Sequence, residues 1–478
     1  MKTKKLSILV IAVVILALAL AACQPAPAPE PVEEPVAEEP AAEEPAEEPA
    51  AEEPAAEEPA EEPAEESPLA GVTVQFWHVY GEGLPMEGMN ALVDEFNKTN
   101  EYGITVEALD QGHYSDIEDK MNAAILSGDL PDVLMAYTNT LTDWYSVDAI
   151  ADISGLIDDP DYGLTAEEKA ALYPSAFDAG LAPDGARIAY PLTQSANVLV
   201  YNYTWAEEMG FDMIPATSEQ FKEQMCKGTE VNTELGGDFA GTGGLVYYPS
   251  STNFLHWLYA FGGSELNEAG DAYDFASEEA IAAAMFLNEL RDAGCTFETE
   301  SYPNPEQAQR KAFVTMSSTA GFPYYVAAFE DEGSEDNWGF IGAPGPDGQV
   351  AVDAFQQMLG VVNTTPDKQM ASWIFIKWLT NAENQATWIR DYSGYLPTQS
   401  TTADLLADYA ADNPVWAEGA ALAAIGPAEP QTFPAWSSVR RAVGDAAAQL
   451  FQATSEEEVV AILTQLTEDA NALVAEVQ

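Results

Sequence analysis

The sequence has few positive charges. It carries 17 lysines and arginines against 80 aspartates and glutamates, which gives a formal net charge of −63. A protein that binds nucleic acid neutralises phosphates with a basic surface, and no stripe of bases is present here. The composition therefore argues against a nucleic-acid partner and predicts a solvated acidic surface.

The first residues predict export. A start rich in lysine precedes an apolar run over 6–22, which is typical of a secretory signal, and Leu20-Ala21-Ala22-Cys23 resembles a bacterial lipobox. Cleavage before Cys23 would leave a lipid on its sulfur, so we expect attachment to the membrane through a lipid anchor only. The alternative is an uncleaved transmembrane anchor, for which the run is short. Either reading places the rest of the chain on the extracytoplasmic face of the cell envelope, in the periplasm or at the cell surface.

Residues 24–67 repeat glutamate, proline and alanine, with no aromatic and no basic residue. Such a segment cannot bury a core, so we expect a disordered, extended tether. The remainder, 68–478, is long enough for two lobes with separate cores.

Cysteine and histidine are scarce in this remainder. Cys226 and Cys295 have no second cysteine or histidine at zinc-ligand spacing, and an even pair in an exported chain favours a disulfide, with two buried thiols as the alternative. The three histidines are scattered, and no motif predicts a metal or a cofactor.

The first part of the body alternates strand and helix patterns. A β-branched run over 71–77 is followed by helical spacing over 86–99, a strand over 104–109, a helix over 114–127 and a short strand over 131–135. Alternation of this kind predicts an α/β fold with a mainly parallel sheet, whose ligands gather outside the carboxyl ends of the strands.

The later part adds strands over 187–192 and 196–202, on either side of polar residues 193–195, and another over 312–316. Helical periodicity or capping residues predict further helices over 218–226, 252–261, 277–293, 369–380, 383–390, 439–451 and 455–474.

Several segments, in order along the chain, resemble the extracellular solute-binding proteins of ABC sugar importers, the group that includes maltose-binding and glycerol-3-phosphate-binding proteins. Each segment is weak alone, and their order over most of the chain behind a lipobox makes the likeness specific. They are 92–96, 126–133, 188–192, 201–202 before 209–211, 321–324, and 373–384 leading to 394–397.

This resemblance implies a two-lobe periplasmic-binding-protein fold with hinge crossovers and a ligand cleft between the lobes. By analogy, lobe 1 is 68–187 plus 351–391 and lobe 2 is 188–350 plus 392–478, with a hinge that includes 188–194. It also implies a monomer that closes over a small solute, most simply a sugar, and delivers it to ABC permease subunits rather than acting as an enzyme.

A sugar presents flat C–H faces and a rim of hydroxyls, so its site needs aromatic platforms and a few polar side chains. By motif position, Tyr137 and Tyr324 match the family's aromatic platforms, although tryptophan is common where Tyr324 stands. The candidate ligand-binding residues are Trp77, His78, Tyr80, Tyr137, Asn139, Asn253, Trp257, Tyr324, Phe355, Tyr395 and Trp436. Core packing is the alternative for Trp257, which shares a helical stripe with other apolar residues, and we expect Tyr80 and Tyr324 to lie in turns beside glycines.

Two other classes of function stay open. A secreted glycan-degrading enzyme would use paired carboxylates, which cannot be singled out in so acidic a chain. A binding protein for a peptide or a glycerol phosphodiester is the other alternative, and for an anionic solute Arg187 beside the hinge is the arginine to watch. The acidic turn 158–163 lacks the carboxylate spacing of a calcium loop, and the glycines at 241–244 lack the downstream lysine of a phosphate loop.

Overall fold

The computed structural model describes residues 67–299, 302–426 and 429–477. Glu65–Gln478 forms one compact unit. The signal segment, Cys23 and the tether up to residue 66 lie outside the described residues. Among the helices that are described, none combines the length and the apolarity that a membrane span requires.

In the described part of the chain, nine strands form one mixed sheet in the order β2-β1-β3-β11-β4-β7-β5-β6, and β8 also pairs with β4. The group β2, β1 and β3 is parallel, as is the group β7, β5 and β6, and the antiparallel strands β11 and β4 join the two groups. The strands are β1 (Thr73–His78), β2 (Thr105–Asp110), β3 (Val133–Ala136), β4 (Tyr190–Asn202), β5 (Leu245–Val246), β6 (Thr296–Phe297), β7 (Val314–Ser318), β8 (Trp338–Ile341) and β11 (Asp353–Val361), with a separate pair β9 (Ala343–Pro344) and β10 (Val350–Ala351).

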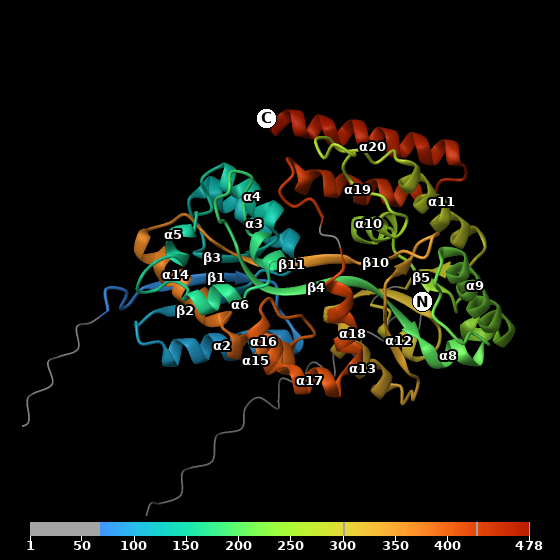
Figure 1. Cartoon of the computed structure of the whole chain (residues 1–478), viewed down its shortest axis with the longest axis horizontal. Helices are drawn as coiled ribbons and strands as arrows, with labels where there is room; N and C mark the ends of the chain where they lie inside the picture. Colours follow the sequence, from blue (N-terminus) through green and yellow to red (C-terminus); the bar gives the residue numbers. More distant parts are fainter. Residues whose placement is uncertain (1–66, 300–301, 427–428, 478) are drawn as a thin grey trace, which may run out of the picture. The chain divides into compact units, whose positions relative to one another are not determined.

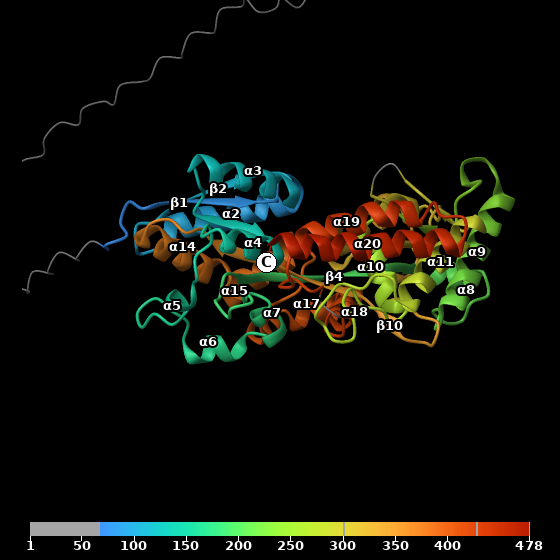
Figure 2. The same ribbon diagram turned by 90° about the horizontal axis from the view of Figure 1, so that it is seen from above.

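Helices cover both faces of the sheet (Figures 1 and 2). They are α2 (Gly83–Thr99), α3 (Tyr114–Ser127), α4 (Thr138–Ser146), α5 (Ser154–Ile157), α6 (Ala166–Ala171), α7 (Pro174–Asp178), α8 (Tyr203–Glu208), α9 (Ser218–Leu235), α10 (Ser251–Ala260), α11 (Glu278–Asp292), α12 (Asn304–Ala308), α13 (Phe322–Asp331), α14 (Pro366–Leu379), α15 (Ala382–Thr387), α16 (Ser400–Leu405), α17 (Ala407–Asp412), α18 (Pro414–Ala423), α19 (Trp436–Leu450) and α20 (Glu456–Val477), with one turn of π-helix at Trp388–Tyr392. The predicted α/β class is confirmed, and the first five elements follow the predicted order.

The first βαβ unit shows why the periodicities are informative. Along β1 the side chains alternate, so that Val74 and Phe76 are fully buried. On α2 the expected apolar stripe is buried, and Phe96 packs edge-on against Phe375 of α14, 5.2 Å between ring centroids. A helix on either side of a parallel strand pair leaves the carboxyl ends of the strands open for a site.

The strands β4 and β11 run side by side across the middle of the structure (Figure 1), and they correct one prediction. We expected two strands separated by polar residues 193–195, whereas Tyr190–Asn202 is one continuous strand. The polar residues stay in the sheet because β11 pairs with them, Gln356 opposite Gln194 and Phe355 opposite Ser195. The ladder shifts register between Gln357 and Met358.

Two further differences concern local structure. Helix α9 runs to Leu235, well beyond the expected end at 226, because its inner face stays buried as far as Asn232. Tyr324 lies in the first turn of α13 rather than in a loop, since Pro323 can occupy a first helical turn without losing a hydrogen bond. Cys226 of α9 and Cys295 form a disulfide with 4.7 Å between their Cα atoms, the pair that the cysteine count favours.

Candidate functional site

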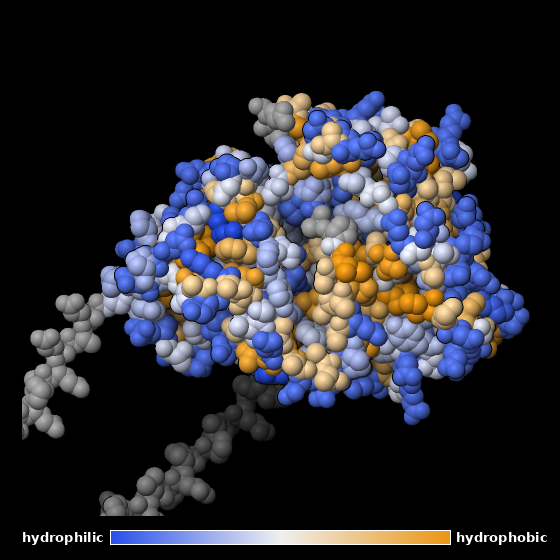
Figure 3. Space-filling model, viewed as in Figure 1, coloured by the Kyte–Doolittle hydropathy of each residue, from blue (hydrophilic) through white to orange (hydrophobic). Residues whose placement is uncertain are grey.

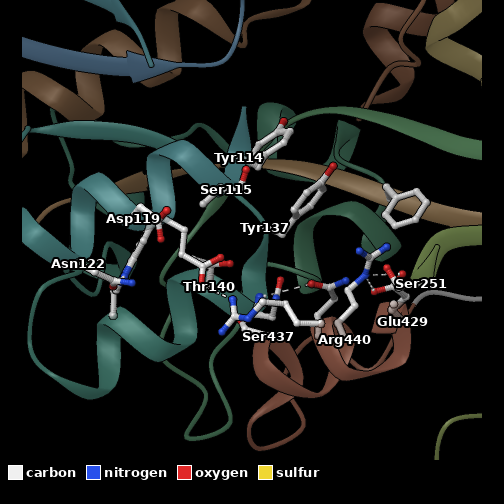
Figure 4. Close-up of a pocket in the computed structure, with 18 residues that line it drawn as sticks. Tyr114, Ser115, Asp119, Asn122, Tyr137, Thr140, Ser251, Glu429, Ser437 and Arg440 are labelled. Carbon is white, nitrogen blue, oxygen red and sulfur yellow. Dashed lines mark hydrogen bonds and ion pairs between the residues drawn. The ribbon is translucent and has the colours of Figure 1, made fainter. Parts of the chain in front are cut away.

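A cavity of about 530 Å³ opens where β3 ends and α3 faces α19. On this face of the molecule the surface is hollowed between α3 and α19, and mainly hydrophilic side chains surround the hollow (Figure 3). Side chains from α3 and α4 line one side, and α10, α19 and the segment before α19 line the other (Figure 4). The lining residues are Tyr114, Ser115, Glu118, Asp119, Asn122, Ala136, Tyr137, Asn139, Thr140, Trp144, Ser251, Phe355, Glu429, Gln431, Ser437, Arg440, Arg441 and Gly444.

Three aromatic rings form one wall of this cavity. Tyr137 follows β3 directly and precedes α4, so it stands at the carboxyl end of a buried strand. Its ring centroid lies 4.5 Å from that of Tyr114 at the start of α3 and 6.1 Å from that of Phe355 on β11. Burial raises the pKa of Tyr137 to about 12, so its hydroxyl keeps its proton at neutral pH. A wall of rings with neutral hydroxyls suits the C–H face of a sugar.

Gln357 of β11 holds Tyr114 of this wall together with two tyrosines behind it. Its side-chain oxygen accepts hydrogen bonds from Tyr80 Oη at 2.9 Å and Thr193 Oγ1 at 2.5 Å. Its amide nitrogen donates to Tyr114 Oη at 2.7 Å and to Tyr395 Oη at 2.8 Å. All donors and acceptors of the amide are thus used, which fixes both the amide and the tyrosines.

Polar contacts cross the cavity from α3 and α4 to α19. Asn139 Nδ2 donates to Ser437 Oγ at 2.8 Å, and both side chains are buried. Arg441 forms an ion pair with Glu118 at 2.6 Å, with the arginine largely exposed. These contacts join elements that pack on the two strand groups.

Arg440 and Glu429 form the polar floor of the cavity (Figure 4). Arg440 Nε donates to both carboxylate oxygens of Glu429, at 2.7 and 2.9 Å, and its Nη2 donates to Thr252 Oγ1 at 2.7 Å. The guanidinium carbon also lies 5.8 Å from the ring centroid of Phe355. Charge-assisted bonds on several sides hold this arginine in one position.

Of the candidate residues, the structure brings Tyr137, Asn139 and Phe355 to the cavity and places Tyr80 and Tyr395 behind them. Trp77 and His78 lie on β1, away from the lining. His78 is buried, its Nδ1 accepts a hydrogen bond from the backbone N–H of Tyr80, and burial lowers its pKa to about 4. His78 is therefore neutral and supports the turn that carries Tyr80.

Three candidates on α10 and α19 pack beside the cavity instead of lining it. Trp257 is fully buried between Phe221 and Phe286, with centroids 5.2 and 5.0 Å away, so the core-packing alternative describes it. Trp436 is buried as well, and its Nε1 donates to Glu429 at 3.0 Å, which makes it a support for the floor. Asn253 donates from Nδ2 to the Tyr248 carbonyl at 2.9 Å.

Tyr324 is also outside this cavity. It is 52% exposed and lines a second, open cavity of about 370 Å³ together with Tyr302. The reason is its position on the outer side of the first turn of α13, whereas the neighbouring Phe322 and Tyr325 point into the core.

The residues that sequence reasoning missed are mostly those that hold others in place: Tyr114, Gln357, Glu429, Ser437, Arg440 and Arg441. Because bases are scarce in this sequence, each arginine was a possible site residue. That scarcity could have pointed to Arg440 and Arg441, but Arg187 was the arginine chosen from the sequence. In the structure Arg187 is buried, with its guanidinium carbon 3.4 Å from the centroid of the Phe177 ring, and it takes no part in the cavity.

No group of three or more histidine, cysteine or acidic side chains that could hold a metal occurs within the described ranges. At the acidic turn, Lys377 Nζ donates to the Gly163 carbonyl at 2.6 Å, and Asp158 pairs with Lys169. Lysine ammonium groups thus occupy the surroundings in which a calcium ion would have to bind.

A family model described as bacterial extracellular solute-binding protein matches residues 91–423. Among curated proteins, none matches the chain.

Solved structures share the fold at low identity. The cyclic alpha-maltosyl-1,6-maltose binding protein from Arthrobacter globiformis is 20% identical with a TM-score of 0.68, covering 85% of this chain and 99% of that one. Maltose-bound MalE3 of T. maritima is 21% identical with a TM-score of 0.68, at 83% and 99% coverage. UgpB from Mycobacterium tuberculosis, in complex with glycerophosphocholine, is 18% identical with a TM-score of 0.71, at 84% and 98% coverage.

These similarities establish the two-lobe periplasmic-binding-protein fold for this chain. The family match spans well over half of the sequence, from α2 to the end of α18. The chain therefore belongs to the family of bacterial extracellular solute-binding proteins.

Proposed function

We propose that this protein captures a neutral sugar or oligosaccharide in the cavity between α3 and α19 and delivers it to the permease of an ABC importer. It acts as a binding protein rather than as an enzyme. The observation that carries the proposal is the wall of Tyr114, Tyr137 and Phe355, opposite a polar floor in the same cavity. Rings stack on sugar C–H faces while carboxylates, amides and hydroxyls bind the hydroxyl rim.

The charges of the cavity favour a neutral solute. Both of its arginines are already paired, Arg440 with Glu429 and Arg441 with Glu118. A phosphate would have to displace a carboxylate from one of them, which leaves the carboxylate without its partner in a partly desolvated site. A sugar hydroxyl can instead accept from the arginine or donate to the carboxylate without breaking either pair.

We further propose that the molecule works as two lobes that hinge on β4 and β11, with lobe 1 formed by 68–187 plus 351–391 and lobe 2 by 188–350 plus 392–478. The contacts of Asn139 with Ser437 and of Glu118 with Arg441 would then form on closure. A lipid on Cys23 would hold the monomer at the membrane, with 24–67 as the tether. Binding would select the closed arrangement, which the permease distinguishes from the open one.

Calorimetric titration with a panel of solutes tests the sugar proposal. Glucose, maltose and maltotriose are compared with glycerophosphocholine and a tripeptide, on the parent chain and on three variants. Tyr137→Ala should weaken sugar binding about tenfold or more, because a stacking platform is lost, while Tyr137→Phe keeps most of the affinity. Tyr145→Ala, on the helix that follows Tyr137 but outside the cavity lining, is the matched control. Binding of the phosphodiester or the peptide alone would contradict the proposal.

A glycerol phosphodiester is the second candidate, and the two arginines of the cavity favour it over a peptide. For that solute, Arg440→Gln should abolish binding, and binding should weaken steeply with added salt. For a neutral sugar the salt dependence should be slight.

A further inference from the structure

Four ionisable side chains gather at the floor of the cavity, two of which, Glu429 and Arg440, line it. Asp353 begins β11, Glu265 lies between α10 and α11, Glu429 precedes α19, and Arg440 is on α19. The three carboxyl groups are almost completely removed from solvent, with Asp353 at 0% exposure. Three buried carboxylates against a single guanidinium would be a large uncompensated charge.

The hydrogen bonds of this acid cluster, Asp353, Glu265 and Glu429 with Arg440, are unevenly distributed. Glu429 accepts from Arg440 Nε and from Trp436 Nε1. Glu265 accepts from the Tyr259 hydroxyl. Neither carboxyl oxygen of Asp353 accepts a hydrogen bond from any described residue, although the group lies within hydrogen-bonding reach of Glu429.

A carboxylate in that position would have no donor, and it would face a second carboxylate. A protonated carboxyl group resolves both difficulties, because its O–H donates to Glu429 and its charge disappears. We propose that Asp353 is a carboxylic acid at neutral pH and that its hydrogen bond to Glu429 positions Arg440 in the floor of the solute cavity. Asp353 is thus a positioning residue, and its role in binding rests on the function proposed above.

The surroundings of Asp353 support this assignment from every side. Burial raises the pKa of Asp353 most, Glu429 and Glu265 raise it further, and Arg440 lowers it. The hydroxyls of Tyr259 on α10 and Tyr137 before α4 also face the cluster, and both stay protonated because burial raises their pKa values. With Asp353 protonated, Arg440 keeps Glu429 as its ion-pair partner, and no second full negative charge lies beside that pair except for Glu265, whose pKa burial raises to about 7.

Loss of the proton from Asp353 would move the floor of the cavity. A second anion beside Glu429 would compete for Arg440, whose Nη2 also binds Thr252 and whose plane lies over Phe355. Because the same guanidinium faces the solute, its displacement should weaken binding at high pH.

Infrared difference spectroscopy tests the proton without any solute. The comparison is made in the Glu265→Gln background at pH 7, so that no acid band arises from Glu265. We expect a carboxylic-acid carbonyl band that disappears in Asp353→Asn. Asp132→Asn is the matched control, because Asp132 is also buried but has a cationic partner, Lys368, whose Nζ donates to both of its carboxylate oxygens. If Asp353→Asn removes no band, Asp353 is ionised and the proposal is overturned.

Titration with maltotriose as the probe tests the positioning role. The parent chain should lose affinity about tenfold as the pH rises through the pKa of Asp353, since one unit of pKa corresponds to a tenfold change in equilibrium. Asp353→Asn, which still donates an N–H to Glu429, should bind like the parent at pH 7 and show no such decline. Asp353→Ala should bind maltotriose weakly both at pH 7 and at a pH above the pKa of Asp353. Equal pH dependence in the parent and in Asp353→Asn would refute the positioning role, whereas no maltotriose binding together with a normal infrared result would count against the proposed sugar function alone.

Discussion

Asn139 Nδ2 of α4 donates a hydrogen bond to Ser437 Oγ of α19 over 2.8 Å, between residues 298 positions apart in the sequence. It is a buried contact in the lining of the cavity, and it connects the elements around β3 with the elements around β5 to β7. In a protein that closes over its solute, such a bond stabilises the closed form relative to the open one.

Ser437→Ala should therefore weaken solute binding about fivefold, which corresponds to one buried hydrogen bond of roughly 1 kcal/mol. Ser437→Thr retains the hydroxyl and should restore most of the affinity. Calorimetric titration with whichever sugar of the panel binds measures both. Unchanged affinity in Ser437→Ala would mean that the bond is present equally in the open and closed forms.

Gln357 should be far less tolerant of substitution than its neighbour. Gln357→Leu removes all four side-chain hydrogen bonds and leaves buried tyrosine hydroxyls without a partner, so we expect a loss of about 3 kcal/mol in unfolding free energy. Gln356→Leu is the control, because the side-chain oxygen of Gln356 has no partner among the described residues. Its effect in urea unfolding should stay below about 1 kcal/mol. Similar losses for both variants would argue against Gln357 as the centre of the tyrosine network.

The Cys226–Cys295 disulfide should contribute substantially to stability. It closes a loop with a sequence separation of 69, for which loop-closure entropy predicts about 4 kcal/mol, with measured values often lower. The double variant Cys226→Ser with Cys295→Ser should show this loss in guanidinium unfolding. A reductant should destabilise the parent chain by a similar amount and leave the double variant unaffected. If the reductant destabilises the parent chain and the double variant equally, its effect does not come from the Cys226–Cys295 disulfide.

Because of Glu265, we expect the free energy of unfolding to decrease toward alkaline pH. Burial raises its pKa to about 7 in the folded chain, above its ordinary value of 4.5. The folded state therefore binds the proton more tightly, and the stabilisation is complete below about pH 4.5 and lost as the pH rises through about 7. The difference is on the order of 3 kcal/mol. Urea unfolding at pH 5 and pH 8 should show it in the parent chain, and Glu265→Gln should reduce it.

The parts of the fold that the sequence predicts well are those with a clear period. The stripe Met89, Leu92, Val93 and Phe96 indicated α2, and all four residues are buried. β11 was not predicted, because Asp353–Val361 is buried on both faces and carries two glutamines in its middle, so neither alternation nor an apolar run marks it. Only pairing with β3 and β4 makes such a segment a strand.

The same limit applies to the site. Tyr137 and Asn139 could be predicted, because both follow a short buried strand and strand ends carry ligand sites in this class of sheet. Glu429 and Arg440 could not, since no pattern in the sequence links them to α3, and only the packing of α19 across the cavity brings them there. Trp257 and Trp436 attracted attention as large aromatic residues, yet buried tryptophans serve packing more often than binding.

The register shift between Gln357 and Met358 interrupts the ladder that joins the two strand groups. A sheet bends and twists most readily at such an interruption. The residue at the interruption is also the one to which Tyr80, Tyr114 and Tyr395 are bonded, directly behind the aromatic wall. We therefore expect flexing of the backbone at this point to reorient the rings, so that a solute that orders the rings would also set the angle between the two strand groups.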